Sequence, residues 1–252
     1  MPRYTGKYIP IDTEELTSVV HPFMLDCLTK YSLEEMEEWL SPFITDERKG
    51  KIADVLQSRL TTLSVACESP TDIHNALAIV RTAEALAVPT MHVIDHELRK
   101  KEGRGTMQGA NMWSHVHFHR ELAQYRVAMQ AGGIKVAAAV AEGGNTLSDI
   151  PLDEKVCFLF GNEMRGLTEE AVEFADYTFT LPMYGMTSSY NLSIAAALTL
   201  KEVTDRKRAM LNGASDITAK NLLYETVVSY VRTLGFDTSE KMLREMQCRA
   251  KN

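Results

Sequence analysis

The feature that most constrains the fold is an alternation of short apolar segments with helical segments, which runs from Thr62 to Met210. The apolar segments predict strands at Leu63–Cys67, Met91–Ile94, Ile134–Val140, Val156–Phe160 and Tyr177–Leu181. The segments between and after them predict helices at Ile73–Ala87, Arg120–Ala131, Thr168–Ala175 and Leu192–Met210. Because apolar strands that alternate with helices are covered on both faces, we predict an α/β fold with a parallel sheet sandwiched by helices.

The two ends of the chain have helical patterns instead. Ser32 and Glu35 have the spacing of a capping box, which marks the start of a helix. Further helices are predicted at Thr13–Leu28, Asp46–Arg59, Asp216–Thr233 and Ser239–Arg249. We therefore divide the chain into an N-terminal helical extension at 1–60, an α/β domain at 61–211 and C-terminal helices at 212–252.

Composition limits where such a chain works. A length of 252 residues with 45% hydrophobic content is enough for one sizeable core. The four cysteines show no C-x-x-C spacing, and Cys67 and Cys157 lie in apolar strand segments, which predicts buried, reduced thiols. No stretch approaches the roughly 18 apolar residues of a membrane span, and the N-terminus lacks the apolar region of a signal peptide. We expect a soluble, cytoplasmic protein without a membrane partner.

The charge pattern is acidic overall but basic in places. A net charge of −7 argues against general affinity for nucleic acid. Binding to phosphates depends on local cations, however, and these cluster at 48–51, 99–104 and 206–208. The segment 97–112 is polar and rich in glycine, which fits an RNA-facing loop that orders on binding or an inert linker. As an alternative to phosphate binding, each basic cluster can be interpreted as an ordinary solvent-exposed surface.

Two segments near the C-terminus have the pattern of a binding site. In Phe160–Leu167 and in Leu181–Ser193, a predicted strand breaks into a glycine-containing turn and a helix then begins. Backbone N–H groups and a helix N-terminus converge beyond such strand ends, where α/β proteins place their ligands. The chain has no G-x-G-x-x-G after its first strand and no G-x-x-x-x-G-K-[ST], which argues against dinucleotide and nucleoside triphosphate sites.

Three blocks in this order resemble the SPOUT methyltransferases. Gly161–Leu167 reads G-N-E-x-x-G-L, Pro182–Ala195 reads P-M-x-G-x-x-x-S-x-N-x-S-x-A, and Asn75 precedes Arg81 at the start of a helix. The resemblance covers about Thr45 to Leu211. A further match at 45–48 and at 74–75 points to the TrmH branch, whose members methylate the ribose 2′-oxygen of guanosine 18 in the D-loop of tRNA.

The resemblance implies an S-adenosylmethionine-dependent RNA 2′-O-methyltransferase with tRNA or rRNA as partner, a C-terminal deep trefoil knot and a homodimer. The apolar surplus of the C-terminal helices also favours a dimer, through Leu222, Leu223, Val227, Val228 and Val231. One departure is Tyr190, where the family usually has Leu, which puts the wall of the cofactor pocket in doubt.

The resemblance also assigns roles to residues. Arg81 acts on the 2′-hydroxyl, and the other residues of the catalytic set are Asn75, Glu163, Ser189 and Asn191. Cofactor contacts are expected from Ala139, Gly161, Asn162, Leu181, Met183 and Tyr190. RNA contacts are expected mainly from the basic clusters, and the residues proposed are Arg48, Lys49, Lys51, Arg59, His74, Arg104, Arg206 and Arg208.

Several of these residues have simpler interpretations. Arg81 could pair with Glu84 one helical turn later, and His74 could be an ordinary surface histidine. Guanidinium does not deprotonate in proteins, so we expect Arg81 to stabilise a developing alkoxide electrostatically and not to act as a base. Three histidines alternate on one face of an extended segment at positions 115, 117 and 119, but without nearby cysteines or carboxylates we do not expect a metal site.

Three other functions stay open. A 23S rRNA ribose methyltransferase of the same superfamily, including the antibiotic-resistance type, carries an appended N-terminal α/β domain, whereas residues 1–44 look helical. An inactive RNA-binding scaffold is disfavoured by the intact Arg81, Glu163 and Asn191. A small-molecule binding protein would leave the basic segment at 97–112 unexplained.

Overall fold

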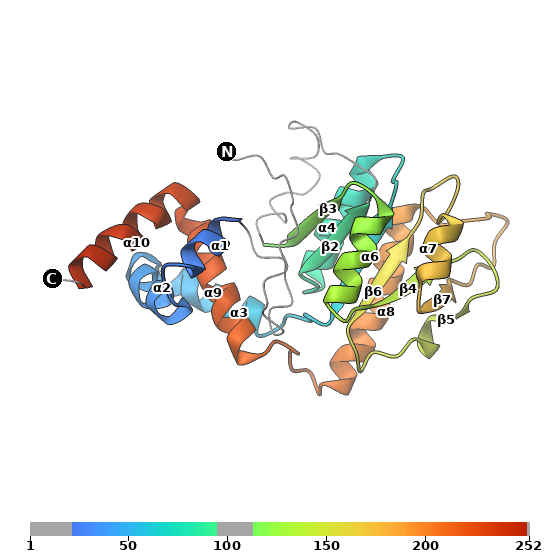
Figure 1. The fold of residues 1–252 in the computed structure, drawn as a ribbon. Coiled ribbons are helices and arrows are strands. Elements are labelled where there is room, and N and C mark those ends of the chain that lie inside the picture. Colours follow the sequence, from blue (N-terminus) through green and yellow to red (C-terminus); the bar gives the residue numbers. More distant parts are fainter. Residues whose placement is uncertain (1–21, 95–112, 251–252) are drawn as a thin grey trace. The chain divides into compact units, whose positions relative to one another are not determined.

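The computed structural model describes residues 22–94 and 113–250 (Figure 1). They form two compact units, an α/β unit within 60–214 and a helical unit that combines 22–59 with 215–250. The predicted loop at 97–112, including Arg104, and the first part of the predicted helix Thr13–Leu28 lie outside the described residues.

The α/β unit is built on a parallel sheet, as the strand–helix alternation predicts. Within the described residues the sheet has seven strands in the order β3-β2-β1-β6-β4-β7-β5. The register pairs Leu63 with Val156 and Ser64 with Thr90, so that β6 and β2 flank β1. The strands are β1 Leu63–Glu68, β2 Thr90–Ile94, β3 His115–His119, β4 Lys135–Ala139, β5 Asn145–Thr146, β6 Val156–Phe160 and β7 Tyr177–Thr180.

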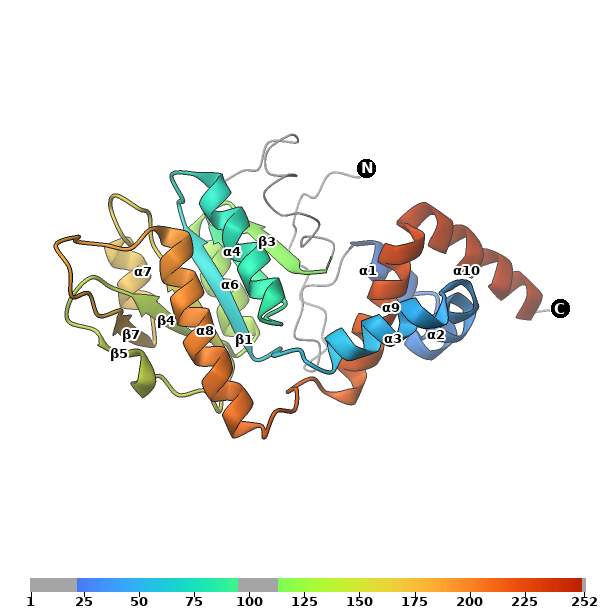
Figure 2. The same cartoon turned by 180° about the vertical axis from the view of Figure 1, so that it is seen from behind.

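Helices cover both faces of this sheet. Figure 1 shows α6 (Leu122–Ala131) and α7 (Glu169–Phe174) on one face, and Figure 2 shows α4 (Ile73–Ala85) and α8 (Leu192–Met210) on the other. One apolar core lies under α4 and α8, and a second lies under α6 and α7. Every residue of β1, β2 and β6 is buried, and β6 is accordingly a continuous apolar run. The buried residues of β1 and β2 are mostly apolar but include Ser64, Glu68, Thr90 and His92.

The helical unit consists of segments from both ends of the chain. Its helices are α1 Pro22–Leu28, α2 Leu33–Leu40, α3 Asp46–Leu56, α9 Ala219–Leu234 and α10 Phe236–Ala250, with a 3₁₀ turn η1 at Ser41–Phe43. The capping box is confirmed, because the Ser32 side chain accepts from the N–H of Glu35 at 3.1 Å and the Glu35 carboxylate accepts from the N–H of Ser32 at 2.8 Å.

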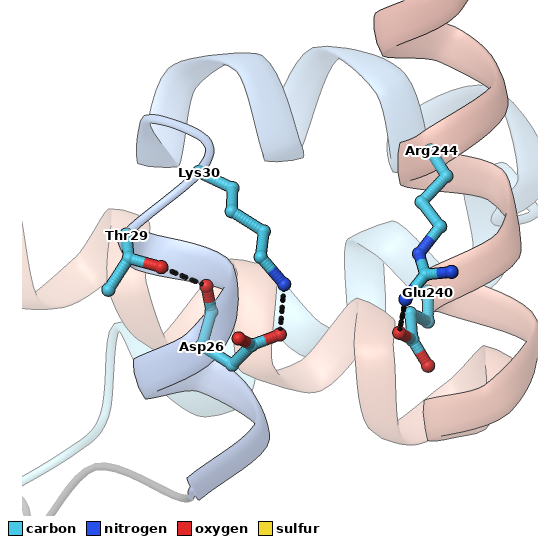
Figure 3. Close-up of polar contacts among 5 residues, drawn as sticks. All are labelled: Asp26, Thr29, Lys30, Glu240 and Arg244. Carbon is cyan, nitrogen blue, oxygen red and sulfur yellow. Dashed lines mark hydrogen bonds and ion pairs between the residues drawn. The ribbon is translucent and has the colours of Figure 1, made fainter.

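Surface ion pairs of this unit stay within single helical turns. Figure 3 shows Lys30 with Asp26 at 2.6 Å and Arg244 with Glu240 at 2.6 Å, while Thr29 donates to the Asp26 carbonyl at 2.7 Å. Both ion pairs are solvent-exposed, so they add little to stability. The unit is held together by apolar packing between helices.

The apolar face of α9 is not available for a partner subunit, which corrects one argument for a dimer. Val227, Val228 and Val231 are at most 4% exposed, and α9 packs against α2, α3 and α10 of its own chain. Leu222 and Leu223 are half-buried. The surplus of apolar residues therefore builds the core of the helical unit.

Smaller differences from the predicted elements have local causes. The helix from Asp46 ends at Leu56, because i→i+3 bonds at Ser58 and Arg59 tighten the chain into a turn. The helix from Ile73 ends at Ala85, and Ala87 has a φ of 63° outside the helical region. Cys67 and Cys157 are buried, as predicted, while Cys248 is exposed. Among the described helices, none has the length and apolar character needed to cross a membrane.

Candidate active site

Three loops meet at the carboxyl edge of the sheet. Strands β1, β6, β4 and β7 are consecutive neighbours and parallel, so the segments that follow Glu68, Phe160 and Thr180 leave the sheet on the same side. These segments are the β1–α4 loop at 69–72, the β6–α7 loop at 161–168 and the β7–α8 loop at 181–191. This edge is where open α/β sheets bind ligands.

A chain of hydrogen bonds joins the three loops. The Glu163 carboxylate accepts from the backbone N–H of Thr71 at 2.8 Å and from Asn75 Nδ2 at 2.9 Å. Asn75 Oδ1 in turn accepts from Asn191 Nδ2 at 3.2 Å. Asn191 also caps α8, because its Oδ1 accepts from the Ser193 N–H at 2.9 Å. We call Glu163, Asn75 and Asn191 the amide network.

The amide network keeps Glu163 ionised. Burial raises the pKa of this carboxyl, but hydrogen bonds from Thr71 and Asn75 outweigh the burial and bring the pKa below its ordinary value. The network thus brings together three of the residues predicted as catalytic, from three separate segments of the chain. Thr71 was not among the predicted residues, and its N–H supplies one of the two bonds to the carboxylate.

The β6–α7 loop is shaped by Asn162 and Gly161. Asn162 Nδ2 donates to the Ser69 carbonyl at 2.6 Å and to Thr71 Oγ1 at 2.9 Å, while its Oδ1 accepts from the N–H groups of 164 and 165. These bonds use every donor and acceptor of the side chain. We therefore reassign Asn162 from a cofactor contact to a residue that shapes the loop.

Gly161 is required because the loop folds back over it. Asn162 and Gly166 exchange backbone hydrogen bonds of 3.0 and 2.9 Å, which places residue 166 directly above residue 161. A Cβ at position 161 would lie 2.2 Å from the Gly166 carbonyl carbon and 2.2 Å from the Leu167 nitrogen. The crowding comes from the protein's own backbone.

The β7–α8 loop has an apolar base and an open tip. Leu181 and Met183 are half-buried, and so is Ala139, whose strand partner Phe179 lies just before Leu181. Met186 is fully exposed, so the two methionines of this loop do not form a shared apolar cluster. Further along the loop, Ser189 is exposed, and the Tyr190 hydroxyl donates to the Pro182 carbonyl at 3.1 Å.

Arg81 lies outside the amide network. It is exposed on α4, on the same side of the helix as His74, which is seven residues earlier and also exposed. Asn75 points from another side of this helix, toward Glu163. Arg81 forms no ion pair with Glu84 or with any other residue of the described ranges, so the simple salt-bridge interpretation is not supported.

The predicted RNA contacts divide into exposed and buried cations. Lys51 is exposed on α3, while Arg48 and Lys49 are half-buried there. Arg59 is only 4% exposed, which removes it from an RNA-facing surface. Arg206 and Arg208 also turn inward, and their guanidinium groups donate to the backbone carbonyls of Leu147, Ile150 and Leu86. We withdraw these last two as phosphate contacts because their donors hold the fold.

Glu68 is a further residue of this edge that sequence reasoning missed. It is 4% exposed at the end of β1, and its carboxylate accepts from the N–H and the hydroxyl of Thr168 at 2.9 and 2.7 Å. Thr168 caps α7, since its hydroxyl accepts from the Ala171 N–H. The signal that could have identified Glu68 is a carboxylate at the end of a mostly apolar strand.

The histidines of β3 join His92 in a buried stack. Their rings lie 5.1 Å (His117) and 5.2 Å (His119) from the His92 ring, and His92 Nδ1 is 3.0 Å from His119 Nε2. Burial lowers the pKa of His117 to about 3 and of His119 to about 4, so both rings are neutral at pH 7. Within the described residues, no group of three potential ligands could hold a metal ion.

Comparisons with known proteins agree with this architecture. Residues 62–201 match the model of the SpoU rRNA Methylase family. The tRNA (guanosine(18)-2'-O)-methyltransferase of Borreliella burgdorferi is 30% identical over 195 residues, which are 75% of this chain and 89% of that protein.

Two solved structures have the same fold. The TrmH/SpoU tRNA modifying enzyme of A. aeolicus superposes with a TM-score of 0.67 at 24% identity, over 75% of this chain and 98% of that one. The SpoU methyltransferase AviRb from Streptomyces viridochromogenes, in complex with AdoMet, gives 0.52 at 24% identity over 61% and 62% of the two chains. Since the family model covers more than half of its residues, the chain belongs to the SpoU rRNA Methylase family.

Proposed function

We propose that this protein transfers a methyl group from S-adenosylmethionine to the ribose 2′-oxygen of guanosine 18 in tRNA. The observation that carries the proposal is the amide network, which joins Asn75, Glu163 and Asn191 from three distant segments at the ligand-binding edge of the sheet. The family match and the Borreliella relative support the same reaction.

The β7–α8 loop offers groups suited to the cofactor. S-Adenosylmethionine supplies a methyl group on a positively charged sulfonium. Half-buried Leu181, Met183 and Ala139 provide an apolar wall for its adenine ring, and the open backbone of 182–190 can hydrogen-bond the edge of that ring. Glu163 and Asn162 have their side chains engaged within the protein, so they hold the loops in place around this wall.

Arg81 stabilises the negative charge that develops on the 2′-oxygen as this oxygen gives its proton to solvent water and bonds the methyl carbon, whose bond to the sulfonium breaks. One charge about 4 Å away contributes ~4 kcal/mol at an effective dielectric of about 20, against ~1 kcal/mol in bulk water. These values correspond to roughly a thousandfold and about a fivefold gain in rate. Arg81 is exposed in the single protomer, so the larger gain requires that RNA or a second protomer covers it.

A homodimer would provide such a cover. Ile194 and Leu198 are 50% and 46% exposed, and they lie one turn apart on α8, which packs beside the α4 helix that carries Arg81. Exposed apolar residues at this spacing form a stripe suited to a partner helix. We therefore propose a dimer through α8, and a deep trefoil knot in the segment that leads into α8, as the family resemblance implies.

The helical unit would contribute tRNA affinity. Arg48, Lys49 and Lys51 follow one another on α3, with Lys49 only 3.9 Å from Asp46, so at least Lys51 is free to meet a phosphate. An RNA substrate together with free thiols fits a cytoplasmic enzyme. We propose that residues 22–59 and 215–250 form an RNA-holding module that acts in addition to the methyltransferase unit.

The proposal is tested by methyl transfer to an unmodified tRNA transcript, with Arg81→Ala and Arg81→Lys beside the wild type. Affinity for S-adenosylmethionine should stay nearly unchanged, because Arg81 lies outside the amide network and the β7–α8 loop. Turnover of Arg81→Ala should fall by about a thousandfold, following the Coulomb estimate. Arg81→Lys should recover little, since an ammonium cannot present a planar fork to hydroxyl and phosphate together.

The matched control is Arg120→Ala, an exposed arginine two residues before α6, the helix that covers the other face of the sheet (Figure 1). It should transfer methyl groups at the wild-type rate. A near wild-type rate for Arg81→Ala would contradict the assigned role of Arg81. If the protein methylates 23S rRNA but not tRNA, the substrate is ribosomal RNA. If it binds S-adenosylmethionine but methylates neither RNA, the protein is an inactive RNA-binding scaffold.

A further inference from the structure

The β7–α8 loop is closed by a hydrogen bond between its two ends. The hydroxyl of Tyr190 donates to the backbone carbonyl of Pro182 at 3.1 Å, across eight positions of the chain. Between these ends every residue from 184 to 189 is exposed. Tyr184 is 96% exposed and Met186 is fully exposed, so side-chain packing does not fix the tip of the loop.

This bond has no substitute among the other contacts of the loop. Within the ranges 22–94 and 113–250, no second hydrogen bond links the segment 182–184 with the segment 188–190. A loop with an open tip and unpaired ends samples many backbone conformations. The shape of this loop therefore depends on the contact between Tyr190 and Pro182.

Tyr190 also stands next to the amide network. The following residue, Asn191, caps α8 and donates to Asn75 at 3.2 Å, which fixes the backbone on one side of Tyr190. Pro182 follows directly on Leu181, which packs against the core beneath α4 and α8. The hydroxyl thus joins the end of the loop anchored by the network to the end anchored by the sheet.

We propose that Tyr190 is a positioning residue, whose hydroxyl holds the β7–α8 loop in the shape that binds S-adenosylmethionine. The identity of this ligand rests on the proposed function. A loop that is ordered before the ligand arrives loses less conformational entropy on binding, so the ligand binds more tightly. A partly exposed hydrogen bond of this kind corresponds to a change of about twofold to tenfold in affinity.

The experiment compares Tyr190→Phe and Tyr190→Leu with the wild type. Tyr190→Phe keeps the ring and removes only the hydroxyl, and Tyr190→Leu removes both. The matched control is Tyr184→Phe, which loses a hydroxyl in the same loop that makes no hydrogen bond within the described residues. Three kinds of measurement are made: calorimetric affinity for S-adenosylmethionine, KM and kcat with a tRNA transcript, and NMR order parameters of the backbone amides of 183–190 without ligand.

Tyr190→Phe should lower the NMR order parameters of the backbone amides of 183–190 and bind S-adenosylmethionine about twofold to tenfold more weakly. Its KM for the cofactor should rise by the same factor, while kcat stays within about twofold, because the hydroxyl shapes the loop and does not touch the reacting oxygen. Tyr190→Leu should lose at least as much affinity, and Tyr184→Phe should match the wild type in all three measurements.

Wild-type affinity and wild-type order parameters in Tyr190→Phe would overturn the proposal. A normal Tyr190→Phe beside a weakened Tyr190→Leu would also overturn it, since the ring and not the hydroxyl would then be responsible. If the wild type fails to bind S-adenosylmethionine, the proposed function fails instead. The NMR order parameters then still decide whether the hydroxyl orders the loop, and unchanged values in Tyr190→Phe refute it.

Discussion

Replacing Glu163 with Gln tests whether the amide network holds the three loops together. The substitution keeps the shape of the side chain but exchanges one carboxylate oxygen for an NH₂ group. In the wild type both oxygens accept, from the Thr71 N–H at 2.8 Å and from Asn75 Nδ2 at 2.9 Å. A Gln side chain can accept only one of these bonds and points an N–H donor at the other.

The network cannot relax by turning its amides. Asn191 Oδ1 is held by the Ser193 N–H, so Asn191 presents Nδ2 to Asn75 Oδ1, and Asn75 must present Nδ2 to Glu163. One charge-assisted bond is therefore lost. Because Glu163 is half-buried and water can replace part of the bond, we expect a loss of about 1–2 kcal/mol. For a chain of this size that lowers Tm by roughly 2–8 °C.

The assay is thermal unfolding between pH 3 and pH 8, with Glu173→Gln as the control. Glu173 is exposed on α7 and makes no hydrogen bond within the described residues. The pKa of Glu163 is lowered in the folded protein, so its stabilisation is present above the ordinary value of 4.5 and is lost as the pH falls through the folded pKa. The Tm difference between Glu163→Gln and wild type should accordingly be constant from pH 5 to 8 and shrink below about pH 4.5. Equal Tm values for the two at pH 7 would refute the structural role of the network.

Three further predictions concern other parts of the molecule. Gly161→Ala should destabilise the β6–α7 loop by about 1–3 kcal/mol and weaken S-adenosylmethionine binding in calorimetry, because the new Cβ meets backbone 2.2 Å away at Gly166; equal stability would contradict this packing. Stability should fall as the pH drops from 6.5 to about 4, because His117 and His119 bind protons in the unfolded chain but stay neutral in the folded protein. In urea titrations, His117→Phe should therefore show a smaller decline of the unfolding free energy with falling pH. The same decline as in the wild type would contradict this. Replacing Arg48, Lys49 and Lys51 of α3 with Ala should lower the slope of log affinity for tRNA against log salt concentration by up to about 2.7 units. An unchanged slope would place this helix away from the RNA.

A strand of the sheet could be predicted from the sequence where all of its residues are buried and apolar. The strand at Val156–Phe160 was predicted with its observed bounds, because all five residues are buried and apolar. The two-residue strand β5 at Asn145–Thr146 is polar and exposed, so no apolar pattern marks it, and only its pairing with β7 makes it a strand. The segment His115–His119 showed the alternation of a strand, but the burial of its histidine rings depends on their contacts with His92 on the neighbouring strand.

The sequence motifs pointed to residues that the structure brings together, whereas the direction in which the arginine side chains point could not be predicted. Asn75, Glu163 and Asn191 were found from their spacing in three blocks, and the structure joins them by hydrogen bonds. Arg206 looked like a phosphate contact because it lies in a basic run. Its partners are carbonyl groups of the 3₁₀ turn η3 at Leu147–Asp149 and of the next residue, about 60 positions away in sequence, and such a contact has no sequence signal.

The most direct test of the central claim is nucleoside mapping by mass spectrometry after incubating the purified protein with S-adenosylmethionine and an unmodified tRNA transcript. We expect a single new 2′-O-methylguanosine at position 18, and none with Arg81→Ala over the same time. A methyl group on a base, or a transcript that gains none while the wild-type protein binds the cofactor, would contradict it.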